Sequence, residues 1–180
     1  MKQINRLIVF LVFIFCLPAA VQAEPLAEQD ISRLSRHREI EHILYEVYAK
    51  TDQGPASVLG YHFDRFITEN AYFALGIFGA VGGGRGGYGI ASFGFGYRLP
   101  LREGWNLDTK LLMGSGGGGG VPGGGGFATQ VSGGLSVEIR ENIFLDVKYG
   151  YLTFPTGTFE TAIYNFGISH QFERLYLPFP

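Results

Sequence analysis

The feature that most constrains the fold is an alternation of apolar and polar residues that recurs in eight segments. In the stretch "ILYEVYAK", Ile43, Tyr45 and Val47 fall on one side of an extended chain, and Glu46 and Lys50 fall on the other. Successive side chains of a β-strand point to opposite faces, so a period of two predicts strands. The eight predicted strands are residues 42–50, 56–66, 71–81, 87–99, 105–114, 126–139, 143–153 and 158–172.

The lengths and connections of these segments predict a membrane-spanning meander. Most segments have 9–14 residues, whereas a tilted strand needs about 9–11 to cross a bilayer and a globular strand has about 5–6. Two kinds of connection alternate along the chain. The short, charged ones are 68–70, 102–104 and 140–142, and the glycine- and proline-rich ones are 52–55, 82–87, 115–125 and 155–157. This order is typical of an up-and-down antiparallel sheet with tight turns at one end and loops at the other.

The two faces of the predicted strands differ in a way that indicates which face meets solvent. One face carries large apolar residues such as Tyr61, Phe93 and Phe95, and the other carries small or charged residues. The interior of an eight-stranded barrel is too narrow to hold so many aromatic rings. We therefore expect the inverted pattern of a transmembrane barrel, with apolar residues toward lipid and polar residues within. The charges expected to form an interior ion-pair network are Asp64, Arg98, Asp108, Lys110, Glu138, Asp146 and Lys148.

The N-terminus is typical of a secretory signal peptide, which we expect to be cleaved after Ala23. Lys2 and Arg6 precede an apolar run, and Val21 and Ala23 occupy the −3 and −1 positions. The alternative, an uncleaved anchor helix, needs about 20 apolar residues, and the run from 7 to 20 has 14 and contains a proline. Loss of residues 1–23 removes the single cysteine and two of the 14 basic residues, which leaves a net charge of −4. An acidic exported chain argues against nucleic acid as a partner.

The rest of the chain divides into a leader, a barrel and a tail. Residues 24–41 are the most charged part, and Ile31, Leu34 and Ile40 recur at nearly helical spacing. We interpret this part as a periplasmic leader; a short amphipathic helix is an alternative. The barrel is expected over residues 42–172 and a C-terminal tail over 173–180.

These features together resemble the small OmpA-type and OmpX-type bacterial outer-membrane barrels. The resemblance rests on the signal peptide, the eight alternating strands, the short charged turns and the last strand "TAIYNFGISHQF", which ends in the aromatic Phe172 as the terminal signal of such proteins does. It covers residues 42–172 as a pattern, without a residue-level motif of one family, and this chain departs from it by continuing for eight residues. The resemblance implies contact with outer-membrane lipid and lipopolysaccharide, insertion by the outer-membrane assembly machinery, and a monomer.

Glycine is concentrated in one loop and on the polar face. Residues 116–126 contain nine glycines and predict a flexible external loop. A phosphate-binding loop is disfavoured, because no lysine follows the glycines. On the polar face the small residues are Gly60, Gly76, Gly94, Gly96, Gly134, Ser92, Ser132 and Ser136. They leave three interpretations open: a narrow passage, a slot for an acyl chain, or strong curvature of the barrel wall.

Evidence for catalysis is weak. His62 and Asp64 share one strand face, and Ser132 and Ser136 are expected on the same interior face, so these four residues are the candidates for a Ser–His–acid site. Some small barrels are lipid A acylhydrolases or palmitoyl transferases, but the His-x-Ser pairing expected of the deacylase type is missing. The histidines show no metal-ligand spacing, and no cofactor motif is present. We therefore expect these groups to satisfy one another in a packed polar interior.

The sequence thus favours an all-β, eight-stranded outer-membrane barrel with a non-enzymatic role in envelope integrity, surface interaction or minor permeation. Two alternatives remain: a lipid A-modifying enzyme, and a soluble periplasmic β-barrel that binds an apolar ligand.

Overall fold

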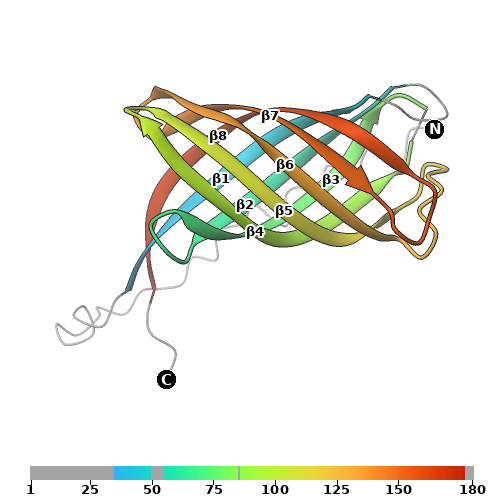
Figure 1. Ribbon diagram of the computed structural model, residues 1–180, viewed down its shortest axis with the longest axis horizontal. Coiled ribbons are helices and arrows are strands. Elements are labelled where there is room, and N and C mark those ends of the chain that lie inside the picture. Colours follow the sequence, from blue (N-terminus) through green and yellow to red (C-terminus); the bar gives the residue numbers. More distant parts are fainter. Residues whose placement is uncertain (1–34, 50–54, 85, 177–180) are drawn as a thin grey trace, which may run out of the picture. The chain divides into compact units, whose positions relative to one another are not determined.

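The computed structural model describes residues 35–49, 55–84 and 86–176 as a closed barrel of eight antiparallel strands (Figure 1). The strands are β1 (Ser35–Tyr48), β2 (Ala56–Phe66), β3 (Ala71–Gly82), β4 (Gly89–Arg102), β5 (Trp105–Gly117), β6 (Phe127–Arg140), β7 (Ile143–Thr153) and β8 (Glu160–Tyr176). Each strand pairs with the next, and β1 pairs with β8 to close the barrel. The predicted signal peptide and residues 24–34 lie outside the described residues. Among the described residues there is no helix long and apolar enough to cross a membrane.

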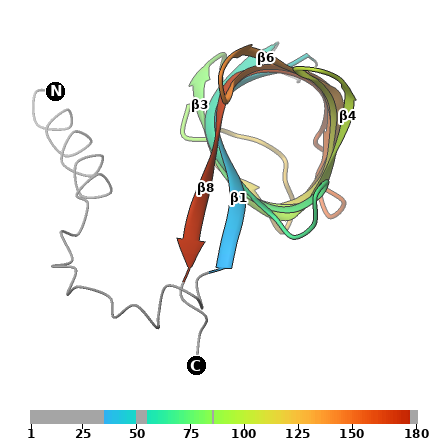
Figure 2. The same ribbon diagram turned by 90° about the vertical axis from the view of Figure 1, so that its left-hand side faces the viewer.

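The first and last strands are longer than predicted. β1 begins at Ser35 instead of residue 42, so residues 35–41 belong to a strand and not to the leader, and β8 runs through to Tyr176 instead of ending at 172. The reason is mutual pairing: Ser35 lies opposite Tyr176, and the ladder continues without interruption into the barrel. An ion pair between Arg36 and Glu173 crosses this ladder at 3.1 Å. Figure 2 shows the ends of β1 and β8 projecting together beyond the ring of strands.

The short turns are built for direct reversal of the chain. Glu103 and Gly104 join β4 to β5, and Glu141 and Asn142 join β6 to β7. The second residue of each turn has a positive φ, 71° at Gly104 and 60° at Asn142, which glycine and asparagine tolerate best. A register shift follows beside each turn. All three short turns lie at the same end as the start of β1, and the loops lie at the other end; we call these the turn end and the loop end.

The outer surface is apolar along the strands. Ile43 is 64% exposed, Ile77 62% and Phe95 61%, and the remaining large outward side chains form a continuous belt around the barrel. Large apolar side chains exposed on all eight strands are unusual for a soluble monomer. Closure also leaves no unpaired strand edge, as hydrocarbon requires. The predicted orientation of the two faces is therefore confirmed.

The interior divides into two halves. The loop half is filled by an apolar cluster that includes Tyr48, Val58, Phe78, Leu152 and Phe154. The turn half holds a smaller apolar cluster (Ile40, Phe66, Tyr72, Ala74 and Leu112) together with most of the buried charges. The sequence analysis predicted a polar inner face and did not anticipate apolar clusters inside the barrel. The cluster residues occupy the same alternating, inward-facing strand positions as the buried polar residues.

Inward glycines make room for the rings that fill the barrel. Gly60 lies opposite Phe78, Gly76 opposite His62 and Gly96 opposite Tyr72 on neighbouring strands. A Cβ atom added to these glycines would lie 2.0, 2.1 and 2.2 Å, respectively, from the opposite ring. The small residues at these positions therefore serve packing, and the rings occupy the space that a slot or passage would need.

Candidate functional site

The candidate site is a group of charged side chains buried in the turn half, which we call the interior ion-pair cluster. It consists of His42, Asp64, Arg98, Asp108, Lys110, Asp146 and Lys148, and all seven side chains are buried. They come from β1, β2, β4, β5 and β7, so the cluster crosses the barrel from wall to wall. Each points inward because successive side chains of a strand alternate between its two faces, and these residues fall on the inner one.

The cluster is organised around two aspartates. Lys110 Nζ lies 2.9 Å from Asp64 Oδ1 and 2.7 Å from Oδ2. Asp108 accepts from Arg98 Nε at 3.0 Å and from Lys148 Nζ at 2.6 Å. Tyr72 also donates its hydroxyl to Asp108 at 2.8 Å. The three basic side chains balance the three aspartates, which is the condition under which buried charges are tolerated.

His42 links the two sides of the cluster. Its Nε2 lies 2.7 Å from Asp64 Oδ2, and its Nδ1 lies 3.1 Å from Asp146 Oδ2. Sequence reasoning missed this residue. Its signal was available, because His42 has the same parity as Glu46 on the first strand and therefore faces inward. The side chain of Glu46 is held separately by Gln130 at 3.1 Å and Asn165 at 2.8 Å.

Of the seven charges predicted for an interior network, the structure gathers six and separates one. Glu138 is exposed at the rim of the turn end, where its Oε1 accepts from the backbone N–H of Asn142 at 2.9 Å. Glu138 occupies an inward-facing position in the alternation of β6, but it is the last such position before the register shift beside the turn. Glu138 therefore caps a turn and does not belong to the cluster.

The weak catalytic candidates are not assembled into a Ser–His–acid site among the described residues. His62 and Asp64 are consecutive inward residues of β2, but Asp64 pairs with His42, and both ring nitrogens of His62 are buried without a hydrogen-bond partner. The His62 ring packs instead against Phe78, with centroids 4.8 Å apart. Ser136 lies opposite Asp146 and Ser132 opposite Gly150 in the β6–β7 ladder. Within the described part of the chain, no three His, Cys, Asp or Glu side chains are placed to hold a metal ion.

The glycine-rich loop between β5 and β6 is held against the loop between β7 and β8. Thr158 donates its backbone N–H to Pro122 O at 3.0 Å, and Gly125 donates to Thr156 Oγ1 at 3.1 Å. Val121 packs on the apolar cluster of the loop half. In the view along the barrel, this loop lies across the far opening (Figure 2). These hydrogen bonds connect the β5–β6 loop to the β7–β8 loop at the loop end.

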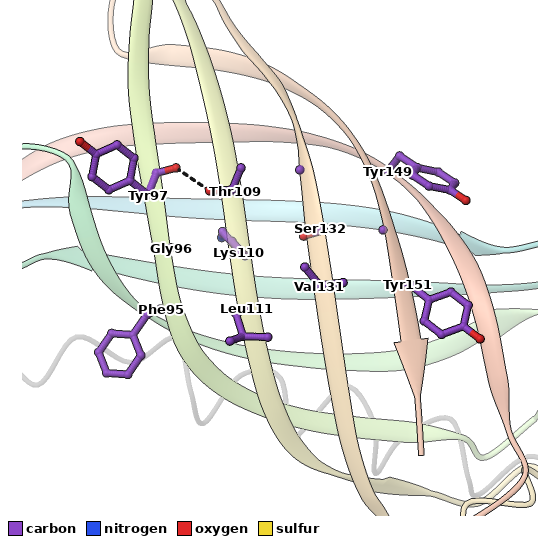
Figure 3. Close-up of a pocket in the computed structure, with 12 residues that line it drawn as sticks. Phe95, Gly96, Tyr97, Thr109, Lys110, Leu111, Val131, Ser132, Tyr149 and Tyr151 are labelled. Carbon is purple, nitrogen blue, oxygen red and sulfur yellow. Dashed lines mark hydrogen bonds between the residues drawn. The ribbon is translucent and has the colours of Figure 1, made fainter. Parts of the chain in front are cut away.

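A hollow on the outer surface crosses strands β4 to β7 (Figure 3). Its volume is about 670 Å³. The rings of Phe95 and Tyr97 stand on one side and those of Tyr149 and Tyr151 on the other (Figure 3). The small residue Gly133 lies between them. The hollow belongs to the apolar belt, so it is an irregularity of the surface predicted to face lipid.

Comparisons with known proteins agree with this architecture. No protein-family model and no curated protein matches the chain. Among solved structures, it is similar to a de novo designed transmembrane β-barrel, with 12% identity, 74% of this chain and 95% of the other covered, and a TM-score of 0.54. It is similar to the outer-membrane protein Ail of Yersinia pestis, with 12% identity, coverage of 77% and 100%, and a TM-score of 0.52. It also resembles the N-terminal β-barrel domain of Pseudomonas aeruginosa OprF, with 15% identity, coverage of 77% and 99%, and a TM-score of 0.51.

These identities are low, so the likeness concerns the fold. The fold is that of the small transmembrane β-barrels, and the predicted resemblance to outer-membrane barrels of this type is confirmed at that level.

Proposed function

We propose that this protein is a monomeric outer-membrane β-barrel that does not conduct and that has a structural, non-enzymatic role in the cell envelope. The observation that carries the proposal is the filled interior. An apolar cluster occupies the loop half, and the interior ion-pair cluster crosses the turn half. A solute would have to displace both to pass through the barrel.

The proposed location rests on the surface and on the fold. The apolar belt needs hydrocarbon around it, and small barrels of this fold include outer-membrane proteins. The belt contacts outer-membrane lipid and lipopolysaccharide, and assembly follows the route that such barrels share. The turn end, where β1 begins and β8 ends, faces the periplasm, and the loop end faces the exterior.

The first test is gel migration of the outer-membrane fraction with and without boiling, followed by conductance of the purified barrel in planar bilayers. We expect a band in that fraction whose mobility changes on heating, and no conductance steps under conditions in which a general porin shows them. A soluble periplasmic band without a shift would overturn the location, and reproducible steps would overturn the closed interior.

Enzymatic activity is tested separately by mass spectrometry of lipid A from cells with and without the protein. The structural role predicts identical acylation. A change in acylation that disappears in a His62→Ala variant would instead support the lipid A-modifying alternative.

A further inference from the structure

A polar pocket opens at the turn end of the barrel, apart from the apolar belt. Its volume is about 320 Å³, and its lining includes Arg38, Arg98, Arg102, Glu103, Glu138 and Phe144. The first three are arginines from β1 and β4. Nothing in the proposed structural role requires a pocket here.

Arg98 is the most informative residue of this lining. Its side chain is only 5% exposed, and its Nε donates to Asp108. Its Nη1 and Nη2 atoms are buried and have no hydrogen-bond acceptor among the described residues. The ring of Phe144 faces the guanidinium with its centroid 5.2 Å from Cζ, which supplies no lone pair in the plane of the N–H groups. Buried donors are rarely left unpaired, so this edge of Arg98 calls for an acceptor.

The other two arginines are partly engaged at the rim. Arg38 stacks on Phe66, with Cζ 3.7 Å from the ring centroid, and donates to the backbone carbonyl of Glu69. Arg102 stacks on Trp105 at 4.2 Å. Stacking fixes the orientation of both guanidiniums and leaves donor positions at their edges.

The charges around the pocket disfavour an anion with a double charge. Three arginines line it against the two carboxylates Glu103 and Glu138. Asp108, the partner of Arg98 Nε, is also bound by Lys148 Nζ at 2.6 Å. Arg98 is already balanced within the interior ion-pair cluster, so Arg38 and Arg102 face Glu103 and Glu138 without a net excess of positive charge, and this disfavours a phosphate dianion.

We propose that this pocket binds a ligand that carries a carboxylate, with its two oxygens on Nη1 and Nη2 of Arg98 and with Arg102 at the entrance. A planar carboxylate matches the two parallel N–H groups of a guanidinium edge. The ligand is a small organic acid or the C-terminus of a peptide, since both present the same group. That the pocket opens to the periplasm rests on the proposed orientation, whereas the binding itself does not.

The test is a titration of the purified, folded barrel in zwitterionic detergent, followed by NMR of the arginine side-chain N–H groups. We expect saturable shifts of Arg98 with propionate, no shift with propionamide and weaker binding of inorganic phosphate at neutral pH. A peptide ending in a free carboxylate, compared with its amide, then distinguishes a peptide terminus from a small acid.

Three variants locate the site. Arg98→Lys keeps a cation beside Asp108 but removes the guanidinium edge, so affinity for propionate should fall about tenfold or more. Arg102→Gln removes an exposed charge and should weaken binding without loss of folding, which the heat-dependent gel shift checks for every variant. Arg140→Gln is the matched control, because Arg140 is an exposed arginine at another turn that does not line the pocket.

Four results would overturn the proposal: no saturable binding, equal binding of propionamide, phosphate bound at least as tightly as propionate, or equal weakening in Arg140→Gln and Arg98→Lys. A high-resolution structure with Arg98 Nη bonded to Asp146, whose Oδ1 also has no partner among the described residues, would overturn it too. Each of these results leaves the gel-shift and conductance tests of the proposed function unaffected.

Discussion

Lys110→Met is the sharpest test of the interior ion-pair cluster. The Lys110 side chain is 3% exposed and the Asp64 side chain 0%, with Nζ 2.7 Å from Oδ2. Methionine has nearly the same length and shape but carries no charge. The substitution therefore leaves the Asp64 carboxylate buried, with His42 as its remaining partner in the cluster.

The size of the effect follows from the geometry. Two unit charges about 3 Å apart attract each other by about 5–6 kcal/mol at an effective dielectric constant of about 20. The desolvation penalty of burying the charged lysine offsets part of this attraction. Removal of one partner from a buried pair typically destabilises a protein by about 3–5 kcal/mol. We therefore expect Lys110→Met to lower the free energy of unfolding by about 3–5 kcal/mol.

The assay is denaturant unfolding of the barrel in lipid vesicles, followed by fluorescence of Trp105, the single tryptophan of the chain. The double variant Asp64→Asn/Lys110→Met removes both charges and should recover most of the loss, because the penalty comes from an uncompensated charge. Lys148→Met is the control: Asp108 keeps Arg98 and Tyr72, so its cost should be smaller. A loss below about 1 kcal/mol in Lys110→Met, or no recovery in the double variant, would refute the reasoning.

Three further predictions concern the packing, the surface and the loop. Gly96→Ala places a Cβ 2.2 Å from the opposite ring, and the same unfolding assay should show a loss of about 1–3 kcal/mol from overpacking; an unchanged free energy of unfolding would mean that this ring moves freely. Phe95→Arg sets a charge in the apolar belt and should cost about 2–4 kcal/mol in a bilayer, whereas stability equal to the parent would favour the soluble alternative. Gly124→Ala places a Cβ 2.0 Å from a loop carbonyl at a φ of 58°, so proteolysis of the β5–β6 loop should accelerate, while Gly86→Ala, which meets nothing within 4 Å, should leave the cleavage rate unchanged.

The strands were predictable because their signal is local and repeated. The predicted ranges of β2 and β7, residues 56–66 and 143–153, agree with the structure at both ends. The start of β1 was not predictable in this way, because charged residues on both faces interrupt the alternation before residue 42. Pairing with the end of β8 decides it, and that partner is more than a hundred residues away.

The inward direction of the buried charges was predictable, but their partners were not. Parity alone turns Asp64 inward. Its pairing with His42 and Lys110 depends on the register between strands and on the curvature of the closed barrel, neither of which a single strand encodes. The contacts of the β5–β6 loop were not predictable for the same reason, since its hydrogen bonds go to a loop about 30 residues later in the sequence.

Arg98 connects the interior ion-pair cluster with the pocket at the turn end. Its Nε belongs to the ion-pair cluster that closes the barrel, and Arg98 is also one of the residues that line the pocket at the turn end. A ligand at the Nη edge of Arg98 would hold the guanidinium in the orientation that also binds Asp108, because the group is planar and rigid. Binding there should therefore stabilise the closed barrel against denaturant, by RT ln(1 + [L]/Kd) if the unfolded chain does not bind. Stabilisation by propionate that vanishes in Arg98→Lys and persists in Arg140→Gln would tie the pocket to the cluster, whereas binding without stabilisation would show that the two edges of Arg98 act independently.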